Sequence, residues 1–207
     1  MFSLRTLAAQ HPLCEIGGSI MANFLLSFLL RQTILCSPSL LPFLQGMYKY
    51  LGQCFSDFKQ RGFVVGYDTR GQVTSMCSSF RLARLTAAVL LAKGVPVYLF
   101  SRYVPTPFVP YAVQQLRAVA GVMITASHNR KEDNGYKVYW ENGAQITSPH
   151  DKEILKCIEE CVEPWNDSWN ENLVDCSPLT RDPLQNISAS YMEDLKKICY
   201  HRSCPKI

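Results

Sequence analysis

Residues 63–100 read FVVGYDTRGQVTSMCSSFRLARLTAAVLLAKGVPVYLF, and this stretch decides the fold. It begins with a short apolar run, FVVGY, that ends in the polar residues Asp68-Thr69-Arg70-Gly71. Apolar residues then recur at helical spacing from Ser78 to Lys93, and the glycine that follows is a natural helix stop. A second apolar run follows at Val95–Phe100. Strands that alternate with helices predict a layered α/β domain with a largely buried sheet.

The same alternation continues on both sides of this stretch. Helices are expected over Leu44–Phe58, from Thr106, from Ser148 and over Ile187–Ile198, strands over Val119–Ile124 and Tyr136–Trp140, and irregular chain over Glu163–Pro183. Thr106 and Ser148 each precede a proline, which is typical of a capped helix start. Ligands of such sheets gather beyond the strand ends, so the loops at residues 68–71 and 125–135 are the places to look for a site.

Composition narrows the class of protein. The chain has 207 residues, 47% of them hydrophobic and 18% charged, which is typical of a globular domain. The net charge is +4, and the sequence has no long basic run and no basic stripe interleaved with aromatic residues. Nucleic acid is therefore not an expected partner.

The nine cysteines include no C-x-x-C pair and no zinc-like cluster. Cys157 and Cys161 are four residues apart and share a helix face. A two-cysteine metal site there is one interpretation, and a pair of buried thiols in a core stripe is the better one. Scattered cysteines in odd number fit free thiols in a reducing compartment, which favours the cytosol.

The N-terminal region contains the apolar stretch Met21–Leu30, which is followed by Arg31. It is too short to span a bilayer as one helix, so no membrane is expected as a partner. The core of a secretory signal is the alternative interpretation, and the sequons at Asn166 and Asn186 matter only in that case.

The loop at residues 125–135, TASHNRKEDNG, carries the chemistry. An apolar strand ends in hydroxyl, imidazole, amide and charged groups, and a serine there needs a base or a charged partner to react. Glycines are missing two residues before and two after Ser127, so the loop is not a nucleophile elbow, and the chain has no P-loop motif. From the residues alone, a solvated loop with an ordinary serine remains the simpler interpretation.

A family resemblance favours a reactive serine over an ordinary one. The runs TASHN (125–129) and DNGYK (133–137) resemble the active-serine signature of the α-D-phosphohexomutases, and VGYDTR (65–70), GVPVY (94–98) and PTP (105–107) resemble other segments of that family's first domain. The resemblance covers roughly Leu44 to Arg202. It implies domain I of that family, a three-layer α/β/α sandwich with a mixed, mostly buried sheet. Residues 1–43 and 203–207 resemble nothing in the family and are expected to be divergent segments.

Within the family, the resemblance is strongest to the branch that contains phosphopentomutases and glucose 1,6-bisphosphate synthase. The run Gly143–Asp151 is similar to that branch. Most family members have proline after Ser-His-Asn, whereas this chain has Arg130, and the run NRKEDNG is most similar to the synthase.

The resemblance also implies roles for the site residues. Ser127 would be the phosphoserine, and its phosphate would be one ligand of Mg²⁺. His128 would orient the phosphoryl group, and Lys137 would act as general acid/base or charge partner. Phosphate or substrate binding would fall to Arg70, Thr125, Asn129 and Arg130. The implied partners are glucose 1-phosphate, glucose 6-phosphate, glucose 1,6-bisphosphate and 1,3-bisphosphoglycerate. From the residues alone, Arg70 and Lys137 could equally be a local ion-pair partner and a solvated strand residue.

Several family motifs do not occur in the sequence: the N-terminal Gly-Thr-x-Gly-Leu-Arg motif, the Asp-x-Asp-x-Asp-Arg metal motif, the sugar loop and the distal-phosphate loop. We therefore expect a truncated form, inactive by itself. Three interpretations stay open: a sugar-phosphate phosphotransferase of the synthase type, a phosphoglucomutase or phosphopentomutase, and an incomplete fragment that acts as a binding module.

Overall fold

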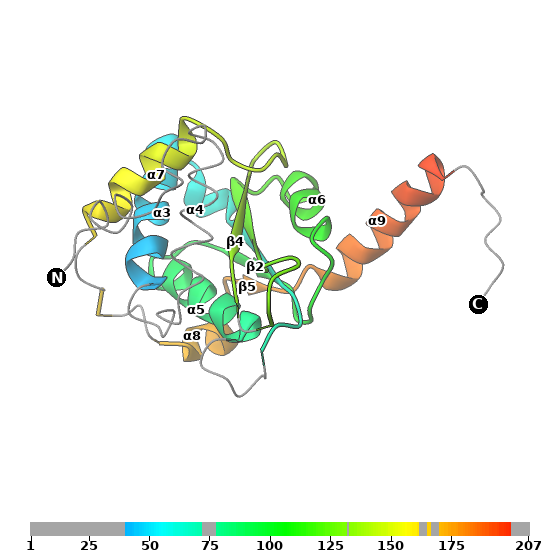
Figure 1. The fold of residues 1–207 in the computed structure, drawn as a ribbon, viewed down its shortest axis with the longest axis horizontal. Coiled ribbons are helices and arrows are strands. Elements are labelled where there is room, and N and C mark those ends of the chain that lie inside the picture. The colour runs from blue at the N-terminus through cyan, green and yellow to red at the C-terminus, as the bar shows by residue number, and fades with distance from the viewer. Residues whose placement is uncertain (1–39, 72–77, 132, 162–164, 167–169, 200–207) are drawn as a thin grey trace.

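A mixed β-sheet forms the centre of the computed structural model, which describes residues 40–71, 78–131, 133–161, 165–166 and 170–199 (Figure 1). Within these residues the sheet has five strands in the order β4-β3-β1-β2-β5. The strands are β1 (Phe63–Tyr67), β2 (Val97–Leu99), β3 (Ala120–Ile124), β4 (Tyr136–Trp140) and β5 (Thr180–Arg181). β1 runs parallel to β2 and β3, β2 runs parallel to β5, and only β4 is antiparallel to its neighbour β3. The predicted mixed, mostly buried sheet is confirmed.

Helices cover both faces of this sheet (Figure 1). They are α3 (Leu40–Cys54), α4 (Phe58–Arg61), α5 (Ser79–Ala92), α6 (Phe108–Gln115), α7 (His150–Glu159), α8 (Asn172–Cys176) and α9 (Leu184–Ile198). The larger hydrophobic cluster joins α3, α5, α7 and α8 to one face, and the smaller cluster joins α6 and the start of α9 to the other. The predicted three-layer α/β/α fold is therefore confirmed.

Side-chain alternation along the strands produces the two layers. On β1, Phe63 and Val65 point into the larger cluster and Val64 points into the smaller one. Glycine lets α6 approach the sheet closely, because a Cβ atom at Gly66 would lie 2.4 Å from Cγ2 of Val109 in α6. The apolar runs in the sequence are thus strands buried on both faces.

The structure corrects two expectations about local structure. The stretch 163–183, expected to be irregular, contains α8 and the edge strand β5, whose Thr180 pairs with Val97. The hydroxyls of Thr106 and Ser148 were expected to cap helices, but α6 and α7 follow Pro107 and Pro149, which offer no side-chain cap. The expected caps were wrong because the prolines, and not the preceding hydroxyl residues, occupy the N-cap positions. β5 was missed because a two-residue strand has too few residues to show a period.

The cysteines of the described ranges lie either in the core or on the surface. Cys157 and Cys161 are buried, and all five cysteines in the described ranges are free thiols. The burial of both thiols agrees with the expected core stripe, and burial raises the pKa of the Cys157 thiol. Among the described helices none is long and apolar enough to cross a membrane, and Met21–Leu30 lies outside the described residues.

Candidate active site

The loop between β3 and β4 carries Ser127 in its first turn. The antiparallel pairing ends at Ile124 and Tyr136, and one more hydrogen bond, from Thr125 N to Gly135 O at 2.9 Å, closes the base of the loop. Asn129 N then donates to Ala126 O at 3.1 Å. This bond defines a β-turn in which Ser127 and His128 are the two central residues.

Ser127 has an unusual backbone for a residue with a side chain. Its φ is +54°, in the left-handed region, and its side chain is exposed. Its backbone N donates to Oγ1 of the buried Thr125 at 3.0 Å. A residue held in this region points to a functional constraint, because the conformation costs about 1–2 kcal/mol for an L-residue. The serine hydroxyl is thereby presented to solvent on a fixed turn.

Arg70 holds this loop from the neighbouring strand end. Its Nη2 donates to the carbonyl oxygen of Ser127, and its Nη1 donates to Arg130 O at 2.6 Å, to Asn129 O at 3.1 Å and to Asp133 O at 3.4 Å. The side chain is only 11% exposed. The guanidinium therefore binds four backbone carbonyl oxygens of the loop.

Asp68 fixes the opposite side of the same guanidinium. Its carboxylate accepts from Arg70 Nε at 3.0 Å and from Arg70 N at 3.0 Å. The backbone here is tied in turn to the start of α5, because Ser79 Oγ donates to Asp68 O at 2.5 Å and Ser79 N donates to Arg70 O. Arg70 is thus positioned by β1 and α5 before it reaches the loop.

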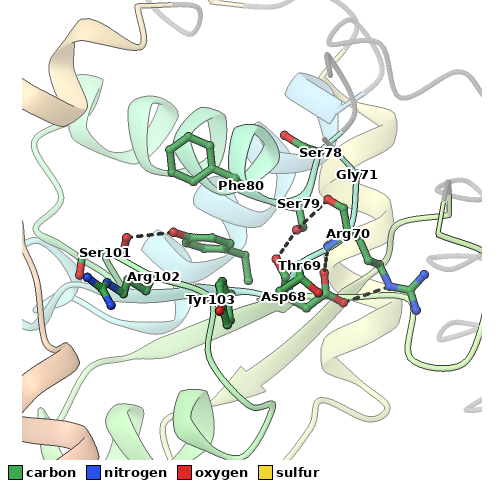
Figure 2. Close-up of a pocket in the computed structure, with 11 residues that line it drawn as sticks. Asp68, Thr69, Arg70, Gly71, Ser78, Ser79, Phe80, Ser101, Arg102 and Tyr103 are labelled. Atoms are coloured by element: carbon green, nitrogen blue, oxygen red, sulfur yellow. Dashed lines mark hydrogen bonds and ion pairs between the residues drawn. The ribbon is translucent and has the colours of Figure 1, made fainter. Parts of the chain in front are cut away.

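A cavity of about 460 Å³ lies beside this pair, beyond the carboxyl ends of β1 and β2 (Figure 2). It is lined by Tyr67, Asp68, Thr69, Arg70, Gly71, Ser78, Ser79, Phe80, Ser101, Arg102 and Tyr103. Figure 2 shows the Arg70 side chain extending past Asp68, with Ser101 and Arg102 at the opposite end of the lining residues. The position agrees with the general rule for open α/β sheets, in which ligands bind outside the strand carboxyl ends.

The remaining predicted residues lie around the loop. His128 and Arg130 are exposed on it, and Asn129 is half-buried. Lys137 is on β4, opposite Met123 of β3, and is half-buried. The loop and the end of β1 therefore bring Ser127, Thr125, Asn129, Arg130 and Arg70 together.

Sequence reasoning assigned no role to Asp68 or Ser79. The signal for Asp68 was its spacing of two residues from Arg70 on a strand end, which permits the local ion pair seen here. For Ser79 the sequence offered only its place at a helix start.

Across the described ranges there is no group of three or more His, Cys, Asp or Glu side chains that could hold an ion. Asp68, the carboxylate next to the loop, is already paired with Arg70. These residues alone therefore do not form a Mg²⁺ site.

The chain is similar in sequence to one protein family and to individual enzymes. Residues 39–164 match the family described as phosphoglucomutase/phosphomannomutase, alpha/beta/alpha domain I. The chain is 88% identical to glucose 1,6-bisphosphate synthase of Homo sapiens over 158 residues, which are 76% of this chain and 25% of that protein. It is 57% identical to phosphopentomutase of Mus musculus over 162 residues, which are 78% of this chain and 26% of that protein.

A solved structure shows the same fold. The crystal structure of a phosphoglucomutase/phosphomannomutase family protein from Burkholderia thailandensis superposes with a TM-score of 0.54 at 21% identity, over 77% of this chain and 31% of that one. At this identity the likeness supports the fold alone. The chain spans about a quarter of the length of the curated relatives it matches.

Proposed function

This chain belongs to the phosphoglucomutase/phosphomannomutase family, and we propose that Ser127 is the residue that carries a phosphoryl group in sugar-phosphate chemistry. The observation that carries the proposal is the placement of an exposed serine hydroxyl at the tip of a turn fixed by Arg70. The nearest exposed neighbours on the loop, His128 and Arg130, bring imidazole and positive charge. Phosphoryl transfer depends mainly on such positioning and on neutralising the phosphate oxygens.

The proposed step is a transfer to the serine. The Oγ atom of Ser127 forms a bond to the phosphorus of a sugar bisphosphate, and the bond from that phosphorus to the sugar oxygen breaks. The hydroxyl proton of Ser127 passes to the released sugar oxygen, so a phosphoserine and a sugar monophosphate result. In the direction of synthesis the same step runs in reverse: the oxygen of a sugar monophosphate bonds to the phosphorus of the phosphoserine, the bond from that phosphorus to Oγ breaks, and the sugar hydroxyl proton returns to Oγ. Lys137 and His128 are the proposed carriers of this proton. Thr125, Asn129 and Arg130 are the proposed groups that hold the phosphate.

Mg²⁺ is part of the proposal only as a partner of the phosphoserine. A phosphoserine carries close to two negative charges, which a divalent cation would neutralise. Because the described residues hold no cluster of three or more His, Cys, Asp or Glu side chains, the Ser127 phosphate is the ligand that we propose among them.

We propose glucose 1,6-bisphosphate synthesis as the activity of the protein to which this sequence belongs. The 88% identity to glucose 1,6-bisphosphate synthase against 57% to phosphopentomutase favours the synthase over a mutase. The proposed compounds are glucose 1-phosphate, glucose 6-phosphate, glucose 1,6-bisphosphate and, as donor, 1,3-bisphosphoglycerate. The proposed compartment is the cytosol.

Phosphoryl uptake by the chain tests the serine. The chain is incubated with Mg²⁺ and ³²P-labelled glucose 1,6-bisphosphate or 1,3-bisphosphoglycerate, and the labelled peptide is identified by mass spectrometry. We expect label on Ser127 and its loss in Ser127→Ala, with full labelling in Ser190→Ala, a matched exposed serine on α9. Label on another residue, or undiminished labelling in Ser127→Ala, refutes the proposal. If neither donor labels the chain, the result supports the alternative interpretation, in which the chain is a binding module.

A further inference from the structure

We propose that Arg70 is a positioning residue for Ser127, which acts by holding the backbone of the loop rather than by binding a substrate phosphate. This inference deepens the function proposed above and rests on it for the role of Ser127. It also replaces the expectation, taken from the family resemblance, that Arg70 approaches the phosphate.

The geometry of the guanidinium supports this role. The Nη1 group is shared among the carbonyl oxygens of Asn129, Arg130 and Asp133, and Nη2 donates to Ser127 O. Nε is occupied by the carboxylate of Asp68. Among the described contacts, one Nη2 hydrogen is therefore left for any phosphate. A phosphate ligand of the usual bidentate kind would need two parallel donors.

The loop needs such a holder because its turn is strained. Ser127 adopts φ = +54° without being glycine, and the loop is exposed over Ser127, His128 and Arg130. A residue in the left-handed region persists where surrounding contacts determine its conformation. Within the part of the chain that the structure describes, the Ser127 backbone is hydrogen-bonded to Thr125 Oγ1 and to Arg70.

The position of Arg70 is fixed from outside the loop. Asp68 binds its Nε and its backbone N, and Ser79 at the start of α5 binds the carbonyl oxygens of both residues. The side chain of Arg70 is 11% exposed, so the clamp is largely shielded from water. Charge-assisted hydrogen bonds of this kind are about twice as strong as neutral ones. The sheet and α5 thereby determine where the serine hydroxyl stands.

The property to test is the ability of the planar guanidinium to donate several hydrogen bonds in fixed directions. Lysine keeps the charge but supplies one ammonium, which cannot bind Asp68 and four separate carbonyl oxygens at once. Arg84 provides a matched control, because it binds Asp175 of α8 through two nitrogens at 3.0 and 2.6 Å and is 20% exposed. Arg84→Lys therefore removes a comparable fork at a site far from the loop in sequence.

Amide hydrogen exchange of the whole chain measures the protection of the loop and does not depend on phosphoryl transfer. In Arg70→Lys we expect exchange of the amides in residues 126–133 to rise roughly tenfold or more, because charge-assisted bonds are lost, while peptides from α3 and α7 keep their wild-type rates. Arg84→Lys should leave the loop unchanged. Asp68→Asn, a milder change, should give the same pattern with a smaller rise. Wild-type protection of the loop in both Arg70→Lys and Asp68→Asn overturns the inference, as does an equal rise throughout the molecule.

Labelling kinetics separate positioning from phosphate binding. With labelled glucose 1,6-bisphosphate, Arg70→Lys should lower the maximal rate of Ser127 labelling roughly tenfold or more at an unchanged half-saturating donor concentration. A raised half-saturating concentration with an unchanged maximal rate would mean that Arg70 binds the donor, and would overturn the inference. If the wild-type chain takes up no label while the loop exchange still depends on Arg70, the proposed function fails and the positioning role stands.

Discussion

Gly46 of α3 lies directly against the backbone of Ile158 in α7. A Cβ atom at Gly46 would stand 2.6 Å from the backbone N of Ile158 and 2.7 Å from its Cα. Both helices pack on the same face of the sheet, in the larger hydrophobic cluster. The crossing of α3 and α7 therefore depends on a missing side chain, because backbone atoms cannot move aside as the end of a flexible side chain can.

The first prediction concerns this crossing. Gly46→Ala should lower the free energy of unfolding by about 1–3 kcal/mol, the usual cost of overpacking, in spite of the higher helix propensity of alanine. Urea denaturation measures the change. Gly52→Ala is the control in the same helix, since a Cβ there meets nothing within 4 Å. It should raise the stability by about 0.5–1 kcal/mol. Equal effects of the two changes would contradict the contact.

Hydrophobic periodicity was sufficient to predict most of the architecture. The runs FVVGY and YKVYW and the helical stripe after Ser78 became β1, β4 and α5, because the burial of apolar side chains determines these elements. β5 was not predictable in this way, since Thr180 and Arg181 form a two-residue edge strand that pairs with β2 from 83 residues further along the chain.

The sequence predicted some residues of the candidate site but neither Asp68 and Ser79 nor the contacts among them. Ser127, Arg70 and the loop follow from the sequence pattern and the family resemblance. The binding of Arg70 to four backbone carbonyl oxygens was not predictable, because backbone acceptors leave no residue pattern in a sequence. The left-handed φ of Ser127 was not predictable either, because glycine and not serine is the residue type that indicates a positive φ.

The second prediction uses the strain at Ser127. Ser127→Gly should be more stable than Ser127→Ala by about 1 kcal/mol, because glycine adopts positive φ without steric cost. Both variants lack the hydroxyl, so the comparison isolates the backbone. Urea denaturation of the two proteins measures the difference. A Ser127→Ala variant as stable as Ser127→Gly would show that the turn relaxes out of the left-handed region.

The third prediction concerns His150, the first residue of α7. In the structure its ring stacks on Trp140 with centroids 4.1 Å apart, and its Nδ1 is hydrogen-bonded to the Tyr50 hydroxyl at 2.9 Å. Loss of the stack and of one hydrogen bond should make His150→Ala about 1–2 kcal/mol less stable in urea denaturation.

A double-mutant cycle identifies the part that belongs to the hydrogen bond. Tyr50→Phe alone should lower the stability by about 1 kcal/mol, and it should have a smaller effect in the His150→Ala background. Strictly additive effects would show that the two side chains do not interact.

The fourth prediction is a pH dependence at the junction of α6 and α9. The Tyr111 hydroxyl donates to Asp194 Oδ2 at 2.6 Å, and this hydrogen bond raises the pKa of Tyr111 to about 12. Because the pKa is raised in the folded chain, the stabilising contribution is complete below the unfolded value of about 10 and is lost as the pH rises towards 12. The carboxylate shows the reciprocal effect, since hydrogen bonds from Lys197 and then Tyr111 lower the pKa of Asp194.

An NMR titration of ¹³C-labelled tyrosine tests this junction, with the Tyr111 signal assigned through Tyr111→Phe. Asp194→Asn should bring the pKa of Tyr111 back towards its ordinary value, because the main cause of the shift is removed. Glu193→Gln is the control: it removes the adjacent carboxylate, which raises the pKa of Tyr111 only through a weaker charge effect, and should change the titration little. If Tyr111 titrates alike in wild type and Asp194→Asn, the hydrogen bond does not hold α9 against α6 in solution.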